Sequence, residues 1–314
     1  MLRSAILAAA RNRRLERMVT RAPVSRSVVR RFVGGADTAA AVGATGRLVQ
    51  RGFTVTLDHL GEDTTDLAHA EAVVHAYVQA LEALHDHGLT ERLDLLTTRT
   101  EVSVKLSAVG QALPDDGEKI ALEHARTICA KARSVGATVT LDMEDHTTTD
   151  STLEILRQLR LDFPETGAVL QAYLYRTEAD CRDLAYPGSR VRLCKGAYHE
   201  PAGVAYQRRL DINRSYVRCM NVLFEGGGYP MFATHDPRLI DVVSRRASAL
   251  GKTAFEMQML YGVRPDEQRR LVADGRTVRI YLPYGSEWYG YLMRRLAERP
   301  ANLAFFVRAL VSRG

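Results

Sequence analysis

The chain has 314 residues, of which 46% are hydrophobic and 25% are charged. These proportions fit a globular protein with a substantial core, and the length allows one large α/β barrel or two ordinary domains. No stretch reaches the ~18 apolar residues that a membrane-spanning helix needs. The formal net charge of +6 would suit a nucleic-acid binder only if it were spread over the body of the chain.

The positive charge is instead concentrated at the N-terminus. Residues 1–31 contain nine arginines and a single acid, Glu16, so this segment carries +8 and the rest of the chain −2. The body is therefore not expected to bind nucleic acid. The basic segment has three readings: an amphipathic segment on an anionic membrane surface, a helix packed on the body with its arginines in water, or an organelle transit peptide.

Common metal and nucleotide motifs are missing from the sequence. The four cysteines are widely spaced and form no C-x-x-C pair, so neither a zinc site nor a redox dithiol is indicated. A reducing compartment is the simplest setting for such thiols. The G-x-G-x-x-G fingerprint and the phosphate-loop pattern are also absent, so a nucleotide cofactor would not bind in the Rossmann manner.

From residue 53 onward, short β-rich runs alternate with longer helical patterns. This alternation predicts a parallel sheet, because parallel strands need crossover connections. The eight runs lie at residues 53–58, 101–106, 137–143, 168–174, 190–195, 230–235, 254–259 and 277–282. Eight such units in ~260 residues match a closed α/β barrel of the (β/α)8 TIM type, with an open doubly wound sheet as the alternative. The small-residue stretch at 34–46 reads as a junction between the basic arm and this barrel.

Polar side chains stand in every run, mostly at or near its end. They are Asp58, Lys105, Asp142, Gln171, Tyr173, Arg192, Lys195, Thr234, His235, Glu256, Gln258 and Tyr281. The active site of an α/β barrel lies at the carboxyl ends of its strands, so this repetition predicts a site there. Alternation in the fifth run places Arg192 and Lys195 on opposite faces, and Gly196 supplies a break that would let Lys195 reach the same ligand. From chemistry alone, Lys195 is also a candidate Schiff-base nucleophile of a barrel aldolase.

An arginine pair follows the last predicted strand. Tyr291 precedes Arg294 and Arg295 by three and four positions, so the three share a neighbourhood on a helix. Glu298 is placed to brace one guanidinium group. Adjacent arginines suit a carboxylate ligand, because the guanidinium fork binds it bidentately and stays charged. The alternative is a solvated helix face with an i,i+4 salt bridge.

Seven segments together resemble the proline dehydrogenase family. They are "SVKLSAVG", "LDMED", "LQAYLYRT", "RLCKGAYHEP", "ATHD", "FEMQMLYGVR" and "YLMRRLAE", in that family's order. The resemblance runs from about residue 50 to residue 310 and implies a distorted (β/α)8 barrel that binds FAD without a Rossmann domain. We accordingly expect an N-terminal basic helical arm at residues 1–48 and a flavin-binding catalytic barrel at residues 49–314.

The resemblance also implies the reaction. L-Proline would be oxidised to Δ1-pyrroline-5-carboxylate, with hydride transfer to FAD and electrons passed on to a membrane quinone. Because the chain ends at Gly314 with no second dehydrogenase domain, the product would go to a separate pyrroline-5-carboxylate dehydrogenase. A quinone acceptor fits a cytoplasmic protein in peripheral contact with the inner membrane surface. The alternative among flavin barrels is a folate reductase-like enzyme, which should use a nicotinamide donor.

The family pattern assigns roles to individual residues. Substrate contacts fall on Lys105, Asp142, Tyr281, Tyr291, Arg294 and Arg295, with Glu298 paired to the arginines. Flavin contacts fall on Met143, Gln171, Arg192, Lys195, Gly196, Ala197, Thr234 and His235. Asp142 and Arg192 are the expected catalytic residues, and no metal ligand is implied. We expect Arg192 to stabilise the negative charge of reduced flavin, and Asp142 to favour a cationic amine with Lys105 as its ion-pair partner.

Overall fold

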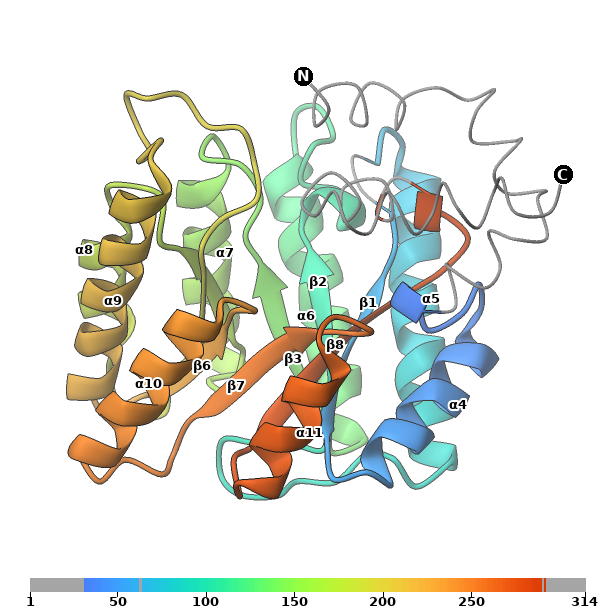
Figure 1. Ribbon diagram of the computed structural model, residues 1–314. Coiled ribbons are helices and arrows are strands. Elements are labelled where there is room, and N and C mark those ends of the chain that lie inside the picture. The colour runs from blue at the N-terminus through green and yellow to red at the C-terminus, as the bar shows by residue number, and fades with distance from the viewer. Residues whose placement is uncertain (1–30, 62–63, 290, 292–314) are drawn as a thin grey trace, which may run out of the picture.

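The computed structural model describes residues 31–61, 64–289 and 291. Eight parallel strands form its centre (Figure 1): β1 Thr54–His59, β2 Thr100–Lys105, β3 Thr138–Asp142, β4 Ala168–Gln171, β5 Arg190–Cys194, β6 Tyr229–Ala233, β7 Glu256–Leu260 and β8 Val278–Tyr284. The helices around them are α4 Thr38–Val49, α5 Leu67–Asp86, α6 Gly117–Ser134, α7 Thr149–Asp162, α8 Thr177–Leu184, α9 Arg209–Glu225, α10 Pro237–Ala249 and α11 Pro265–Ala273, with a 3-10 turn η1 at Ser107–Val109.

The strands close almost completely into a barrel. Their order is β3-β2-β1-β8-β7-β6-β5-β4, so β3 and β4 are the two edges that must meet. They meet at Gly167, whose N–H donates to the Val139 carbonyl (2.8 Å) and whose carbonyl accepts from the Leu141 N–H (2.9 Å). A Cβ at Gly167 would lie 2.4 Å from Thr140 Oγ1, so only glycine allows this approach. The predicted (β/α)8 barrel is confirmed.

Strand alternation separates an apolar shell from a polar barrel interior. In β2, Val102 and Val104 belong to the hydrophobic cluster that the strands share with the surrounding helices. The alternate residues of the same strand, Glu101 and Ser103, accept hydrogen bonds from Arg192, which comes from β5 across the barrel. Apolar burial against the helices therefore stabilises the outer layer, whereas charged and hydroxyl groups fill the interior.

The region expected as a junction is largely helical. Asp37 caps α4, since its carboxylate accepts a hydrogen bond from the Ala40 N–H (2.8 Å). The helix packs on β1, β8 and α5 and buries Ala41 and Leu48 in the main core. An extra N-terminal helix therefore precedes the barrel as predicted, but residues 38–46 are part of its core and not a linker. Residues 1–30 of the basic arm lie outside the described residues, and the division at residue 48 stays a prediction.

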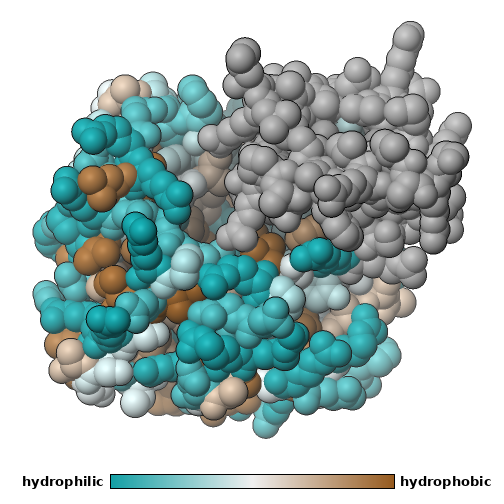
Figure 2. Space-filling view, in the orientation of Figure 1, coloured by the Kyte–Doolittle hydropathy of each residue, from teal (hydrophilic) through white to brown (hydrophobic). Residues whose placement is uncertain are grey.

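The described helices were compared with the requirements of a membrane-spanning helix. No helix in the described part of the chain combines the length and the apolar character that crossing a bilayer would require. Hydrophilic side chains predominate on the coloured part of the face in Figure 2, with smaller apolar areas between them.

Candidate active site

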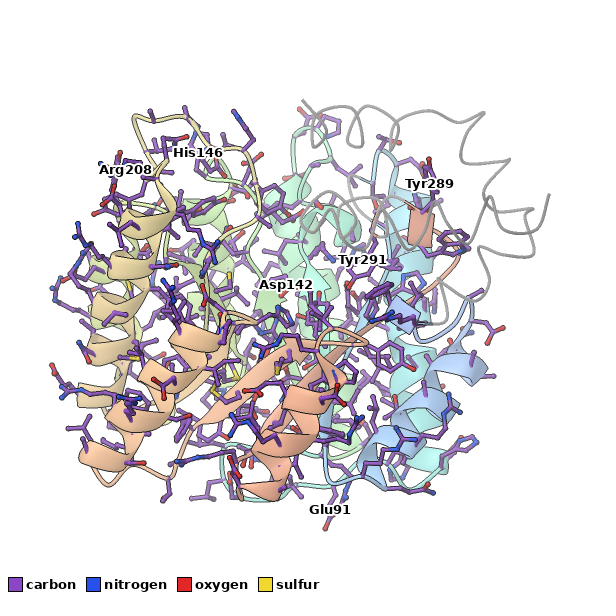
Figure 3. All side chains as sticks on the ribbon, in the orientation of Figure 1. Glu91, Asp142, His146, Arg208, Tyr289 and Tyr291 are labelled. Carbon is purple, nitrogen blue, oxygen red and sulfur yellow. The ribbon has the colours of Figure 1, made fainter. Side chains whose placement is uncertain are left out.

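Side chains from two other strands meet at Asp142, the last residue of β3. Asp142 Oδ1 accepts a hydrogen bond from Arg192 Nη1 of β5 (2.6 Å), and Oδ2 accepts one from the Tyr281 hydroxyl of β8 (2.6 Å). The Arg192 guanidinium also lies over the Tyr281 ring, 5.3 Å from its centroid. Asp142 stands near the middle of the molecule, at the carboxyl end of its strand (Figure 3). Asp142 therefore lies at the end of the barrel where the active site of such a fold is expected.

Burial and neighbouring charges together set the protonation of Tyr281 and Arg192. Burial raises the pKa of Tyr281 well above its ordinary value, and the nearby Asp142 raises it further, so the phenol stays protonated and donates. For Arg192, burial lowers the pKa, but the surrounding groups, Asp142 and Glu101 foremost, raise it by more, and the net pKa lies above its ordinary value. Asp142 thus receives one hydrogen bond from a fixed cation and one from a neutral donor.

Lys105 has a different partner from the one expected. The β2–β3 register places Lys105 level with Asp142, as predicted for neighbouring strand ends. Its Nζ, however, donates to Asp58 Oδ1 of β1 (2.8 Å), while Asp142 is bonded to Arg192 and Tyr281. Burial raises the pKa of Asp58, and Lys105 opposes that rise. The expected Lys105–Asp142 pair is therefore replaced by two pairs, Lys105–Asp58 and Arg192–Asp142.

A second layer of charge lies beneath the site and was not predicted. Glu101 of β2 is fully buried and accepts from Arg192 Nη2 (3.0 Å) and Arg190 Nη2 (2.5 Å). Arg279 of β8 lies 3.9 Å from Glu101 and donates to Glu256 of β7 (2.8 Å). Three arginines and two glutamates thus join β2, β5, β7 and β8 through the barrel interior. The only signal in the sequence was that charged residues occupy inward positions of otherwise apolar strands.

The other residues expected to contact flavin line the carboxyl ends of β3, β4 and β6. Met143 is buried just after β3, and Gln171 Nε2 donates to the Glu144 carbonyl (2.6 Å). Thr234 is buried after β6, and its N–H donates to the Gln258 carbonyl of β7 (3.2 Å). Both strand ends are therefore held by hydrogen bonds to a neighbouring segment.

His235, the next residue of this group, is fixed by the backbone of β7. Its Nε2 accepts a hydrogen bond from the Leu260 N–H (2.8 Å), which requires a ring without a proton on Nε2. Its carbonyl accepts a hydrogen bond from Arg264 Nη1 (2.9 Å). The histidine is therefore anchored on both its side chain and its main chain.

Lys195, Gly196 and Ala197 form the loop that leaves β5. Lys195 Nζ donates to Asp236 Oδ2 (2.9 Å) and forms an ion pair with it. Gly196 has a φ of 107°, and a Cβ there would lie 2.3 Å from the Tyr173 ring. Glycine is thus required by the backbone conformation and by Tyr173. Ala197 is exposed.

The arginine helix is described only at its start. Tyr291 is buried, and its neighbour in sequence is not described. Arg294, Arg295 and Glu298 lie outside the described residues, so their assignment as the carboxylate clamp stays a prediction.

Known proteins decide which family this site belongs to. The sequence profile of the family described as proline dehydrogenase matches residues 41–308. The chain is 42% identical to the proline dehydrogenase of Deinococcus radiodurans over 91% of this chain and 90% of that protein. The chain belongs to the proline dehydrogenase family. A second family member, proline dehydrogenase 1 of Bacillus subtilis strain 168, is 35% identical over the full length of both chains.

Solved structures show the same fold in larger family members. The crystal structure of proline utilization A from Bdellovibrio bacteriovorus, inactivated by N-propargylglycine, superposes with a TM-score of 0.80 at 25% identity. The alignment covers 92% of this chain and 34% of that one, so this chain spans about a third of that protein. Proline dehydrogenase activity and a flavin cofactor therefore follow from the family. The aldolase and folate reductase readings are set aside.

Proposed function

We propose that this proline dehydrogenase oxidises L-proline to Δ1-pyrroline-5-carboxylate with FAD as its flavin and a membrane quinone as the next electron acceptor. The observation that carries the proposal is the Asp142–Arg192–Tyr281 group, in which Asp142 at the end of β3 is held by side chains from the middle of β5 and β8. It presents a cation and a carboxylate side by side. The carboxylate suits the amine of the substrate, and the cation suits a flavin ring that accepts electrons.

The residues present fit a flavin. Within the part of the chain that the structure describes, Arg192 Nε is buried and has no hydrogen-bond partner, so one donor of the guanidinium is left for a ligand acceptor. We propose that Arg192 and the β5 loop hold the ring and phosphates together with the other strand ends: Met143, Gln171, Lys195, Gly196, Ala197, Thr234 and His235. When bound, FAD would accept the two electrons that leave the ring carbon next to the proline nitrogen.

The side chains divide the remaining work by charge. The Asp142 carboxylate would favour the cationic amine of proline, while Tyr281 and Arg192 keep that carboxylate oriented. Lys105, already paired with Asp58, balances the local negative charge. Arg294 and Arg295 would bind the proline carboxylate, with Glu298 bracing them and Tyr291 beside them, because guanidinium forks suit carboxylates.

The proposed partners follow from the fate of electrons and product. A membrane quinone requires peripheral contact of a cytoplasmic protein with the inner membrane surface, and the nine arginines of residues 1–31 suit an anionic surface. A separate pyrroline-5-carboxylate dehydrogenase would consume the product. The amino acid on which the reaction begins is L-proline, and neither metal nor nucleic acid takes part in the proposed reaction.

The deciding experiment is anaerobic reduction by substrate. The purified protein should show the absorbance of oxidised flavin and should lose it when L-proline is added without oxygen. Dithionite serves as the control, since it bleaches any accessible flavin whatever the substrate. A protein that stays free of flavin after reconstitution would contradict the cofactor, and one bleached by dithionite but not by proline would contradict the substrate.

A further inference from the structure

Glu101 occupies an unusual position for a carboxylate. It is the second residue of β2 and is fully buried. Its Oε1 accepts from Thr56 Oγ1 (2.6 Å) and Arg192 Nη2 (3.0 Å), and its Oε2 accepts from Arg190 Nη2 (2.5 Å) and Thr140 Oγ1 (3.2 Å). Four donors from three other strands therefore converge on one side chain.

A buried carboxylate of this kind is costly unless it is fully paired. Burial alone would raise the pKa of Glu101, but Arg279, Arg190 and Arg192 lower it by more, so the group is an anion. Because replacing buried ion pairs by apolar groups is often neutral or stabilising, stability alone is a weak reason for such a cluster. A role in holding one of its arginines is a stronger one.

Arg192 is the member of the cluster that reaches the active site. Its Nη2 donates to Glu101, while its Nη1 donates to Asp142 (2.6 Å) and Ser103 (3.0 Å). The guanidinium is planar, so anchoring both terminal nitrogens fixes the direction of Nε as well. Among the described residues, Nε is the nitrogen left without a hydrogen-bond partner. Glu101 therefore controls the orientation of the donor that remains for a ligand.

We propose that Glu101 is a positioning residue for Arg192. By accepting a hydrogen bond from Nη2, it holds the guanidinium so that Nε stays available to the flavin, and it provides a second carboxylate partner besides Asp142. The inference rests on the proposed function, in which Arg192 faces the flavin ring. Without Glu101, Arg192 would turn toward Asp142, and both groups would lose their working positions.

The barrel contains a matched control for this proposal. Glu256 is also fully buried, and its carboxylate accepts from Arg279 Nε (2.8 Å) and Gln258 Nε2 (2.6 Å). No hydrogen bond or ion pair among the described residues joins Glu256 to Arg192. Glu256→Gln therefore removes a buried charge of the same kind without freeing the guanidinium.

The test compares Glu101→Gln with Glu256→Gln in the flavin-loaded protein. The readouts are the flavin midpoint potential, the FAD dissociation constant from titration of apoprotein, and kcat and KM for L-proline. Both variants should lose stability. We expect Glu101→Gln alone to lower kcat by roughly 10- to 100-fold, the range of a charge-assisted hydrogen bond, with a smaller change in KM.

The direction of the potential separates positioning from simple charge. Removing a negative charge near the flavin, with Arg192 unmoved, would favour the reduced anion and raise the midpoint potential. Displacing Arg192 takes a cation away from the flavin and lowers it. A raised potential, or a Glu101→Gln variant that matches Glu256→Gln in potential and kcat, would overturn the proposal.

A milder variant keeps the proposal testable where Glu101→Gln does not fold. Thr56→Val removes one donor to Glu101 without changing any charge, and we expect a smaller decrease in potential and kcat. An unchanged potential in a folded Thr56→Val protein would then count against positioning. Failure of the proposed function itself would appear in the wild-type protein, as absence of flavin or of bleaching by proline.

Discussion

At the scale of single residues, Asp142 shows how the barrel builds a site from distant parts of the chain. Its two oxygens accept hydrogen bonds from different strands, Oδ1 from Arg192 of β5 and Oδ2 from Tyr281 of β8. The carboxylate can therefore rotate toward neither partner without losing the other. In the proposed function, such two-sided anchoring would hold the substrate amine in a fixed position.

The Tyr281 hydroxyl is the part of this anchor that can be removed most cleanly. Tyr281→Phe keeps the ring beneath Arg192 and deletes the donor to Asp142 Oδ2. A hydrogen bond to a charged group contributes about 1.5–3 kcal/mol, so we expect kcat/KM for L-proline to fall roughly 10- to 100-fold. Steady-state kinetics with proline and a dye acceptor measure this change.

Tyr229→Phe is the matching control. The Tyr229 hydroxyl is buried beside a carboxylate, 3.5 Å from Glu256, but it belongs to the interior layer and not to the site. The control should change stability and leave kcat/KM close to the wild-type value. Equal losses in both variants would mean that Tyr281 acts through the barrel and not through Asp142.

Residue identities were more predictable than residue pairings. Strand alternation and strand ends single out Asp142, Arg192 and Tyr281, because a period of two and a closed barrel place them on one rim. The predicted partner of Lys105 was wrong. Strand β2 has an acid on each neighbouring strand, Asp58 on β1 and Asp142 on β3, and the sequence does not tell which of them the lysine side chain points toward. The sequence marks Asp58 as a polar residue at a strand end and does not identify it as the partner of Lys105.

At the scale of elements, the β-rich runs located all eight strands, whereas residues 34–46 were expected as a junction and belong largely to the core helix α4. The runs at 101–106 and 190–195 differ from β2 and β5 by a single residue at the ends. Glycines at 43 and 46 made α4 look like a junction, because glycine disfavours helices. Tertiary packing of Ala41 and Leu48 against the barrel overrides that local preference.

The contact between β3 and β4 at Gly167 should be sensitive to substitution. Gly167→Ala would place a methyl group 2.4 Å from Thr140 Oγ1 and 3.1 Å from its Cβ, so the two strands must separate. Overpacking of this kind costs about 1–3 kcal/mol of unfolding free energy. Urea unfolding should show a lower midpoint with an unchanged slope.

Gly203→Ala provides the comparison for this contact. A Cβ at Gly203 meets no heavy atom within 4 Å, and its φ is not in the left-handed region. We expect a change within about 0.5 kcal/mol, as for ordinary surface substitutions. If Gly167→Ala were as stable as Gly203→Ala, barrel closure through Gly167 would not limit stability.

At the scale of the whole molecule, the interior charge network could not be predicted from the sequence. Glu101 pairs with Arg190, and Arg279 reaches both Glu101 and Glu256, so partners lie far apart along the chain. Those contacts exist only once the barrel has closed and brought opposite strands together. In the sequence Glu101, Arg190 and Arg279 look like single charges near the start of a strand, where exposure to solvent is the ordinary expectation.

This network makes stability depend on acid pH in a defined direction. The pKa of Glu101 lies below its ordinary value of 4.5 in the folded protein, because three arginines outweigh the effect of burial. The folded state therefore binds fewer protons than the unfolded state below this pH, so the contribution is complete above pH 4.5 and is lost as pH falls. Asp58, whose pKa is raised, contributes to the pH dependence with the opposite sign.

We therefore expect Glu101→Gln to flatten the acid branch of the stability profile. Each proton of difference between the two states gives about 1.4 kcal/mol per pH unit, so the wild-type free energy of unfolding should fall more steeply than that of the variant below pH 4.5. Urea unfolding at a series of pH values measures both slopes. Glu91→Gln is the control, because Glu91 is an exposed acid at the other end of the barrel from Asp142 (Figure 3), paired with Arg99. Its slope should match the wild type, and an equally steep Glu101→Gln slope would show that Glu101 is not the buried anion that the barrel geometry requires.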